Sequence, residues 1–188
     1  PTSLAGVALD LISSSDSGSS STDNKTNITL PTIGLSPLNA LLMRAGDVIQ
    51  ILDASNNTRV LGSYTVLSGD LGAGSLFSAA SKNIVLTTAL TEGTTTLTAR
   101  LVDLAGNLGV VSTSSLSIVV DITPPSSLAG TTLDLPDAQD SGISAIDNIT
   151  SASTPTITVS SLNGKAMLAG DVVQIVDTNH GNAVLGSY

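Results

Sequence analysis

The sequence predicts an all-β protein, an antiparallel β-sandwich, on three observations. The chain of 188 residues is 41% hydrophobic but has no Trp, one Phe and two Tyr. Its core must therefore be built from Val, Ile, Leu and Ala, a composition that favours strands. Short apolar stretches alternate with clusters of Gly, Ser, Asp and Asn, which are turn residues. No segment has a helical period of useful length, and a parallel sheet would need crossover helices.

Seven strands are expected in the first part of the chain, each bounded by turn signals. They cover 7–11, 28–35, 48–53, 59–67, 84–89, 94–103 and 113–121. Pro31 lies within the second of them and predicts an edge position or a bulge, because Pro cannot donate to a ladder. Residues 45–47 are expected to turn into the third strand, and 53–58 to form a hairpin connection to the fourth. Residues 38–43 could form a short strand or a turn, whereas 68–81 are too weakly patterned for an assignment.

The second part of the chain repeats the first at a constant offset of 124 residues. Residues 3–11 return as 127–135, and the match continues without a gap to Tyr188. This period is too long for a solenoid unit and falls in the usual size range of an independent domain. We therefore expect tandem repeats, with a complete repeat at 1–124 and the N-terminal half of a second, homologous repeat at 125–188. The second repeat is either cut short or completed by another chain.

The composition excludes several classes of function. The chain has 15 acidic against 6 basic residues and a net charge of −9, which argues against nucleic acid as a partner and suits divalent cations. It has no Cys, so no disulfide framework is possible. No stretch reaches the ~18 apolar residues of a membrane span. His180 is the one histidine, and Asn56 takes its place in the first repeat. A Ser-His-Asp or Cys-His arrangement cannot be built there, so we expect no enzyme.

Four motifs carry a family resemblance. Asp103-Leu-Ala-Gly-Asn107 follows a Thr-rich strand, and Asp121-Ile-Thr-Pro-Pro125 closes the repeat. The Gly-Asp turn at 46–47 and the loop from Asp-Ser-Gly to Asp-Asn at 16–24 precede them. In this order the motifs resemble the bacterial Ig-like repeats of giant surface adhesins, the Bap-type biofilm-associated and large non-fimbrial adhesins. The resemblance covers the whole first repeat and the available half of the second.

The resemblance implies an Ig-like Greek-key β-sandwich, with several such domains standing in line and calcium stiffening their junctions. It also implies a place outside the cell or on the bacterial cell surface. The repeat departs from the family in length, because Ig-like domains usually have roughly one hundred residues. We expect the surplus to lie in 68–81.

Metal binding by aspartates is the candidate chemistry. Calcium takes about six to eight oxygen ligands from carboxylates, carbonyls and Asn side chains. In an Ig-like sandwich the loop 13–27 lies at the C-terminal end, so Asp121 in the linker should approach it, and the loop 103–107 lies at the opposite end. An ion at the junction would fix the angle between domains. The alternative is that these residues simply make turns, and their spacing is not that of an EF-hand. The predicted ligands are Asp16, Asp23, Asn24, Asp103, Asn107, Asp121, Asp140 and Asp147.

The sequence therefore predicts a structural extender repeat of a secreted or surface-anchored bacterial adhesin, which supports cell adhesion and biofilm formation. Its partners would be neighbouring repeats of the same protein. One alternative is a self-assembling extracellular fibre or matrix subunit, in which copies associate laterally or by strand addition. The other is a carbohydrate- or ice-binding module that presents rows of Thr from 94–98 and 154–158, although the β-propensity of Thr also explains these rows.

Overall fold

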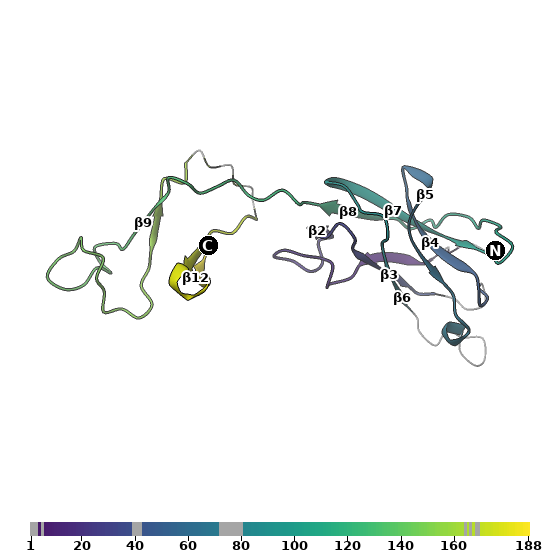
Figure 1. Cartoon of the computed structure of the whole chain (residues 1–188), viewed down its shortest axis with the longest axis horizontal. Helices are drawn as coiled ribbons and strands as arrows, with labels where there is room; N and C mark the ends of the chain where they lie inside the picture. The colour runs from purple at the N-terminus through teal and green to yellow at the C-terminus, as the bar shows by residue number, and fades with distance from the viewer. Residues whose placement is uncertain are drawn as a thin grey trace. The chain divides into compact units, whose positions relative to one another are not determined.

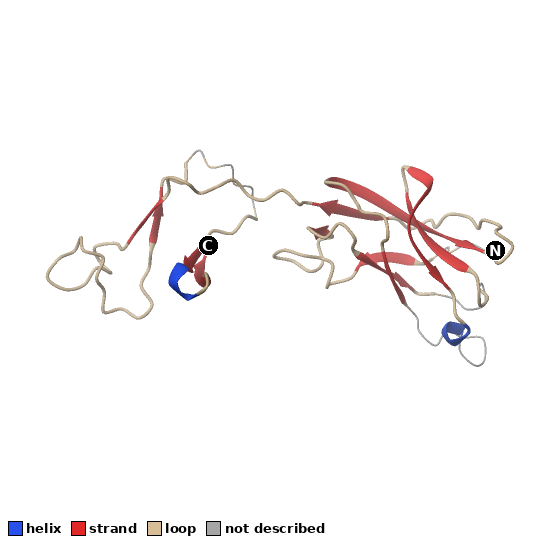
Figure 2. Ribbon diagram, in the orientation of Figure 1, coloured by secondary structure: helices blue, strands red, loops and turns tan. Residues whose placement is uncertain are grey.

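The computed structural model of the chain describes residues 4, 6–38, 43–71, 81–163, 165, 167 and 170–188. These residues form twelve β-strands and two short 3-10 helices (Figure 2), which confirms the all-β prediction. The chain divides into two compact units, Pro1–Thr123 and Pro124–Tyr188. We call them unit 1 and unit 2 and describe each by itself.

Unit 1 is a sandwich of two sheets (Figure 1). The smaller sheet has the order β1-β3-β6 and contains β1 (Ala8–Leu11), β3 (Thr32–Ser36) and β6 (Lys82–Val85). The larger sheet has the order β2-β8-β7-β4-β5 and contains β2 (Lys25–Thr26), β4 (Val48–Asp53), β5 (Asn56–Thr65), β7 (Gly93–Val102) and β8 (Leu116–Val120). All strand pairs are antiparallel except β2 with β8. The crossovers from one sheet to the other give the Ig-like topology that was expected.

The core of unit 1 lies between these sheets and consists of aliphatic side chains. Side chains of a strand point alternately to its two faces, and β8 shows this plainly, since Leu116, Ile118 and Val120 are buried while Ser117 is exposed. Burying one such aliphatic side chain contributes ~1.5–3 kcal/mol. The strand positions that fill the core are Leu9, Leu11, Ile33, Leu35, Ile49, Ile51, Leu61, Ile84, Leu97, Ala99, Leu101, Leu116, Ile118 and Val120.

The prediction for Pro31 is wrong. Strand β3 begins at Thr32, immediately after the proline, and pairs in a regular register with β1 on one side and β6 on the other. It is the middle strand of its sheet and has no bulge. Pro31 is tolerated because it stands outside the ladder, where its carbonyl accepts the N–H of Leu86 at 3.0 Å.

Two other expectations are adjusted by the structure. The hairpin after β4 is tighter than expected, because Ala54 and Ser55 alone form the turn and β5 already begins at Asn56. In the stretch 68–81, the helix η2 (Ser68–Leu71) forms the first residues, and 72–80 lie outside the described residues. Most of the segment 38–43 lies outside them as well, although Leu38 and Met43 at its ends are buried.

Unit 2 contains two antiparallel strand pairs. β9 (Thr132–Asp134) pairs with β10 (Thr158–Ser160), and β11 (Gln174–Asp177) pairs with β12 (Ala183–Ser187), with the helix η3 (Thr178–His180) in the connection. Their register copies unit 1 at the offset of 124, except at the end of the hairpin, where Asp177 pairs with Ala183 whereas Asp53 pairs with Asn56. Leu133 faces Val159 as Leu9 faces Leu35, and the register shift after Ile51 recurs after Ile175.

Candidate functional site

Asp16 organises the loop that follows β1 in unit 1. Its side chain is buried, and its Oδ2 accepts the N–H of Asn24 at 3.0 Å. Asn24 adopts a left-handed backbone conformation with φ of 58°, which Asn tolerates better than most residues. The N–H of Ser17 donates to the carbonyl of Lys25 at 3.0 Å, and the Oγ of Ser17 accepts the N–H of Asn27 at 2.8 Å. The loop therefore closes on itself through hydrogen bonds between its own residues.

The second carboxylate oxygen of Asp16 has no such partner. Asp16 is only 5% exposed, and its Oδ1 is buried without a hydrogen bond from any residue that the structure describes. An unsatisfied buried polar group costs roughly 1–3 kcal/mol, and more when it is charged. Such an oxygen is a good ligand for a hard cation, because a cation would supply the missing partner.

The corresponding loop of unit 2 has the same geometry. Asp140 is 7% exposed, its Oδ2 accepts the N–H of Asn148 at 3.0 Å, and its Oδ1 is likewise buried and unpartnered among the described residues. Asn148 has φ of 57°, and the Oγ of Ser141 accepts the N–H of Ser151 at 2.8 Å. Two loops with different intervening residues thus leave the same carboxylate oxygen free.

The loop of unit 1 lies beside the point where the chain leaves this unit, as the sequence predicted (Figure 1). Strand β2 runs parallel to β8, and the N–H of Val119 donates to the carbonyl of Asn24 at 3.0 Å. The N–H of Asp121 donates to the carbonyl of Thr26 at 2.9 Å, while the Oδ1 of Asp121 accepts the N–H of Thr123 at 3.1 Å.

The predicted carboxylates of this loop are not all gathered at one point. No group of three or more His, Cys, Asp or Glu side chains capable of holding a metal occurs among the residues described. Asp23 is directed to its neighbour, since its Oδ1 accepts the N–H of Lys25 at 3.2 Å and its Oδ2 lies 3.5 Å from the Lys25 Nζ. Asp147 in unit 2 accepts the N–H of Ile149 at 3.2 Å, but Ile149 offers no cation. Any metal in these loops would therefore draw on carbonyl or water oxygens besides the carboxylates.

Asp103 and Asn107 lie at the opposite end of unit 1. Gly93, the first residue of β7, pairs with Val120 near the exit, and the turn after Val102 follows the far end of the same strand. The Oδ1 of Asp103 accepts the N–H groups of Ala105 and Asn107, and its Oδ2 accepts the Nδ2 of Asn107, all within 2.8–2.9 Å. These bonds, with the Asn107 side chain foremost, lower the pKa of Asp103. Both oxygens of the Asp103 carboxylate thus already accept hydrogen bonds from residues of the same turn.

Residues 3–122 match the bacterial Ig-like domain family, and this span includes every strand of unit 1. The chain belongs to the bacterial Ig-like domain family. Bacterial Ig-like domains typically occur in extracellular and surface proteins, and the family is not a catalytic one. A comparison with curated proteins finds no match. Among the helices described, none has the length and apolar character needed to cross a membrane.

Glu92 is a residue of this bacterial Ig-like domain that the sequence did not single out as part of a site. Its Oε2 accepts the N–H of Ile122 at 2.8 Å and so holds the first residues of the linker. The contact joins positions 30 residues apart, and the pairing of β7 with β8 brings them together. The only available signal was that Glu92 is the one glutamate of the chain.

A second polar cluster of the domain lies near η2. The carboxylate of Asp70 accepts hydrogen bonds from the Tyr64 hydroxyl at 2.6 Å, the Leu67 N–H at 2.8 Å and the Lys82 Nζ at 2.9 Å. Desolvation by burial raises the pKa of Asp70, but these three donors outweigh it and lower the pKa to about 2. The Lys82 Nζ also lies 4.1 Å from the centre of the Tyr64 ring. This cluster ties β5 and β6 together and has a structural role.

Proposed function

We propose that this chain is a non-enzymatic extender of a Bap-type bacterial adhesin, secreted or held at the cell surface, which supports adhesion and biofilm formation. The observation that carries the proposal is that a whole bacterial Ig-like domain is followed, at a constant offset, by a second copy of its first half with the same strand register. What recurs is a scaffold rather than a reactive group. The function then belongs to a row of domains, which separates a terminal binding region from the cell.

The beginning of the linker is suited to a mechanical role. The N–H groups of Asp121 and Ile122 are held by the Thr26 carbonyl and the Glu92 carboxylate. Pro124 and Pro125 follow directly, and proline fixes its own φ and restricts the residue before it. The chain therefore leaves unit 1 along a short path with few free torsions. Neighbouring repeats of the same protein are the partners that such a linker would connect.

Calcium is the cofactor we propose for the two loops. The support is the buried, unpartnered Oδ1 that Asp16 and Asp140 share, together with the acidic balance of the chain. Asn24 or Asn148 and backbone carbonyls would be the further ligands of each ion. Asp23 or Asp147 and, at the first loop alone, Asp121 would join only by turning toward the ion, since no three carboxylates are gathered there among the described residues. Bound calcium would neutralise the carboxylates and link the loop to the exit. The Asp103 and Asn107 turn is a weaker candidate, because its own donors already occupy the carboxylate.

The loop of unit 2 should be the stronger site. Ser13 and Lys25 of the first loop are replaced by Asp137 and Ile149 in the second. The second loop therefore carries one more carboxylate of its own, which matches the Asp121 that the linker adds to the first site, and it lacks the ammonium group that pairs with Asp23. Because a neighbouring positive charge opposes the binding of a cation, occupancy should begin in the loop 137–151 and reach the loop 13–27 at higher calcium.

Small-angle scattering of a protein with several repeats tests the mechanism. Bending at the linkers shortens a row of domains on average, so we expect a longer particle with calcium than with a chelator. A matched variant that carries Asn at every position equivalent to Asp16 should keep the short dimensions in both conditions. Equal dimensions of the unmodified protein with and without calcium would remove the calcium mechanism while leaving the spacer role.

A further inference from the structure

We call residues 141–149 of unit 2 the isoleucine loop, because three exposed isoleucines lie in it. The exposed fractions of Ile143, Ile146 and Ile149 are 109%, 87% and 64%. Apolar side chains scattered singly over a surface need no explanation, but several gathered in one place mark a contact surface. The isoleucine loop is therefore a candidate for contact with another molecule.

The exposure of these isoleucines is a property of the loop and not of the core face of unit 2. Their counterparts in unit 1, at the offset of 124, are Ser19, Thr22 and Lys25. All three are exposed, although unit 1 has both of its sheets in place. The same positions thus face water in a unit with a complete core, where they carry polar side chains.

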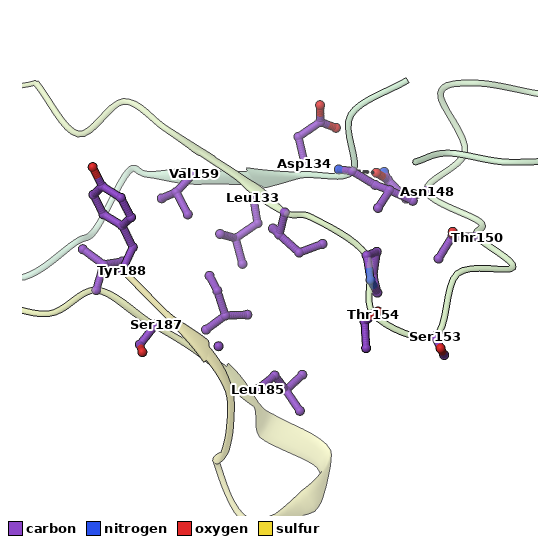
Figure 3. Close-up of a pocket in the computed structure, with 16 residues that line it drawn as sticks. Leu133, Asp134, Asn148, Thr150, Ser153, Thr154, Val159, Leu185, Ser187 and Tyr188 are labelled. Carbon is purple, nitrogen blue, oxygen red and sulfur yellow. Dashed lines mark hydrogen bonds between the residues drawn. The ribbon is translucent and has the colours of Figure 1, made fainter. Parts of the chain in front are cut away.

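Hydrogen bonds hold the isoleucine loop in a defined shape. The N–H of Ser141 donates to the carbonyl of Ile149 at 2.9 Å and closes the loop at its base. The N–H of Asn148 donates to the Oδ2 of Asp140 at 3.0 Å. The Oδ1 of Asn148 accepts the N–H of Leu135 at 3.1 Å and ties the loop to the end of β9 (Figure 3). A loop fixed in this way loses little conformational freedom when it binds a partner.

A second apolar surface lies in unit 1, at the end opposite to its exit. We call it the apolar turn, residues 103–110. Gly46 lies directly beneath it, because a Cβ added to Gly46 would come within 2.5 Å of the Leu104 Cδ2. The turn that contains Gly46 also carries an exposed cation, Arg44. The exposed aliphatic side chains of the apolar turn are Leu104 at 73%, Leu108 at 59% and Val110 at 71%.

The charges of the two surfaces favour a contact between them. The isoleucine loop and its flank carry Asp137, Asp140 and Asp147 and no cation. A symmetric contact of two such loops would bring two sets of these carboxylates together, which is unfavourable. The apolar turn instead offers Arg44 at its side, and the carboxylate of its own Asp103 is already hydrogen-bonded within the turn. Unlike surfaces therefore fit each other better than like ones.

We propose that the isoleucine loop of one copy of this chain docks onto the apolar turn of a second copy. The aliphatic side chains of both surfaces leave water together, and Arg44 faces the acidic loop. Because the two surfaces differ, the contact is heterologous and leaves one of each free, so further copies add in a row. The contact is small, so each association is weak, with a Kd on the order of 0.1 mM. Neither bound calcium nor the spacer role is needed for this contact.

The first test is the concentration dependence of the full chain, kept in chelator. Between about 20 μM and about 1 mM the average mass from analytical ultracentrifugation should rise about threefold or more, as a Kd of this order requires. NMR shift changes over the same range should concentrate in 103–110 and 141–149.

Two variants then separate the surfaces. The loop variant carries Ile143→Ser, Ile146→Thr and Ile149→Lys, the residues that unit 1 has at these positions, so the fold of the loop is kept. The turn variant carries Leu104→Ser and Leu108→Ser. Each variant alone should stay monomeric. A mixture of both should form a dimer and stop there, because the loop variant still has its apolar turn and the turn variant still has its isoleucine loop.

Val85→Ser is the matched control, because it removes an exposed aliphatic side chain of β6 that belongs to neither surface. This variant should associate like the unmodified chain. A chain that stays monomeric throughout, a single variant that still associates, a mixture that does not dimerise, or an equal loss in the control would each overturn the proposal. Binding to vesicles of phosphatidylcholine and phosphatidylglycerol without self-association would also overturn it and assign the isoleucine loop to a membrane.

Discussion

Four strands of unit 1 recur in unit 2 with the same register up to the end of the last hairpin, but unit 1 buries their core-facing side chains far more completely. Ile51 is fully buried between the sheets of unit 1, whereas Ile175, its counterpart, is only half-buried. The loops after β1 and β9 nevertheless share their hydrogen bonds almost one for one. Loop geometry is therefore set by residues close in sequence, while the core depends on β6, β7 and β8, which come later in the chain.

The largest expected effect is a difference in stability loss when matched core side chains of the two units are truncated. Ile51→Ala should destabilise unit 1 by about 2–5 kcal/mol, because it leaves a cavity between the two sheets. Ile175→Ala, at the matched position, should cost well under half as much, because its side chain is already partly in water. Urea unfolding of the full chain, followed by NMR signals assigned to each unit, measures both values. Equal losses of stability would show that the Ile175 side chain is as deeply buried as the Ile51 side chain.

The next largest effect is the pH-dependent stability that Asp70 gives to unit 1 alone. Hydrogen bonds from Tyr64, Leu67 and Lys82 hold the pKa of Asp70 at about 2, below the ordinary value of 3.8. A depressed carboxylate pKa adds stability above the unfolded value, and this stability is lost as pH falls through the folded value. The shift corresponds to about 2 kcal/mol.

Asp70→Asn should therefore lower the free energy of unfolding of unit 1 by about 2 kcal/mol near pH 7. The difference from the unmodified chain should shrink between about pH 4 and pH 2. Thermal unfolding at several pH values measures it. Tyr188, the counterpart of Tyr64, is fully exposed, so unit 2 should show no response to the substitution. A constant difference at all pH values would contradict the assigned cause.

The smallest effect concerns the two loops. Lys25→Ile gives the first loop the residue that the second loop has at this position, and removes the cation beside Asp23. The calcium affinity of the loop 13–27 should rise about threefold, the size expected when one solvent-screened positive charge is removed from beside the ion. Calorimetric titration measures it, with Lys82→Met as the control that removes a cation outside the loop. An equal rise in the control would point to net charge rather than to the site.

Much of the fold could be predicted from the sequence. A strand was expected at 113–121, and β8 (Leu116–Val120) lies within this range. The antiparallel class followed from the number of strands and from the turn residues between them. The expected sandwich also predicted that the loop 13–27 lies beside the linker. Pro31 was misjudged, because a proline one residue before a strand and a proline inside it look alike in sequence.

The polar contacts were harder to foresee. Glu92 meets Ile122, and Asp70 meets Lys82, only because strand pairing brings distant positions together. Asp16 and Asp23 look equivalent in a loop of Asp, Ser and Asn, yet one is buried with an unpartnered oxygen and the other forms an ion pair at the surface. Burial depends on the path of the whole loop, which no local pattern reveals.

The central claim, that the shared buried carboxylate is a calcium ligand, is tested most directly by NMR titration of the full chain with calcium. We predict shift changes confined to residues 137–151 at low calcium and to 13–27 at higher calcium. Asp140→Asn should abolish the first set and Asp16→Asn the second, each without unfolding the loop, because the Asn side-chain oxygen still accepts the N–H of Asn148 or Asn24. Asp10→Asn, on an exposed position of β1, should change neither set. No response up to millimolar calcium, or a response that persists in both loop variants, would contradict the account.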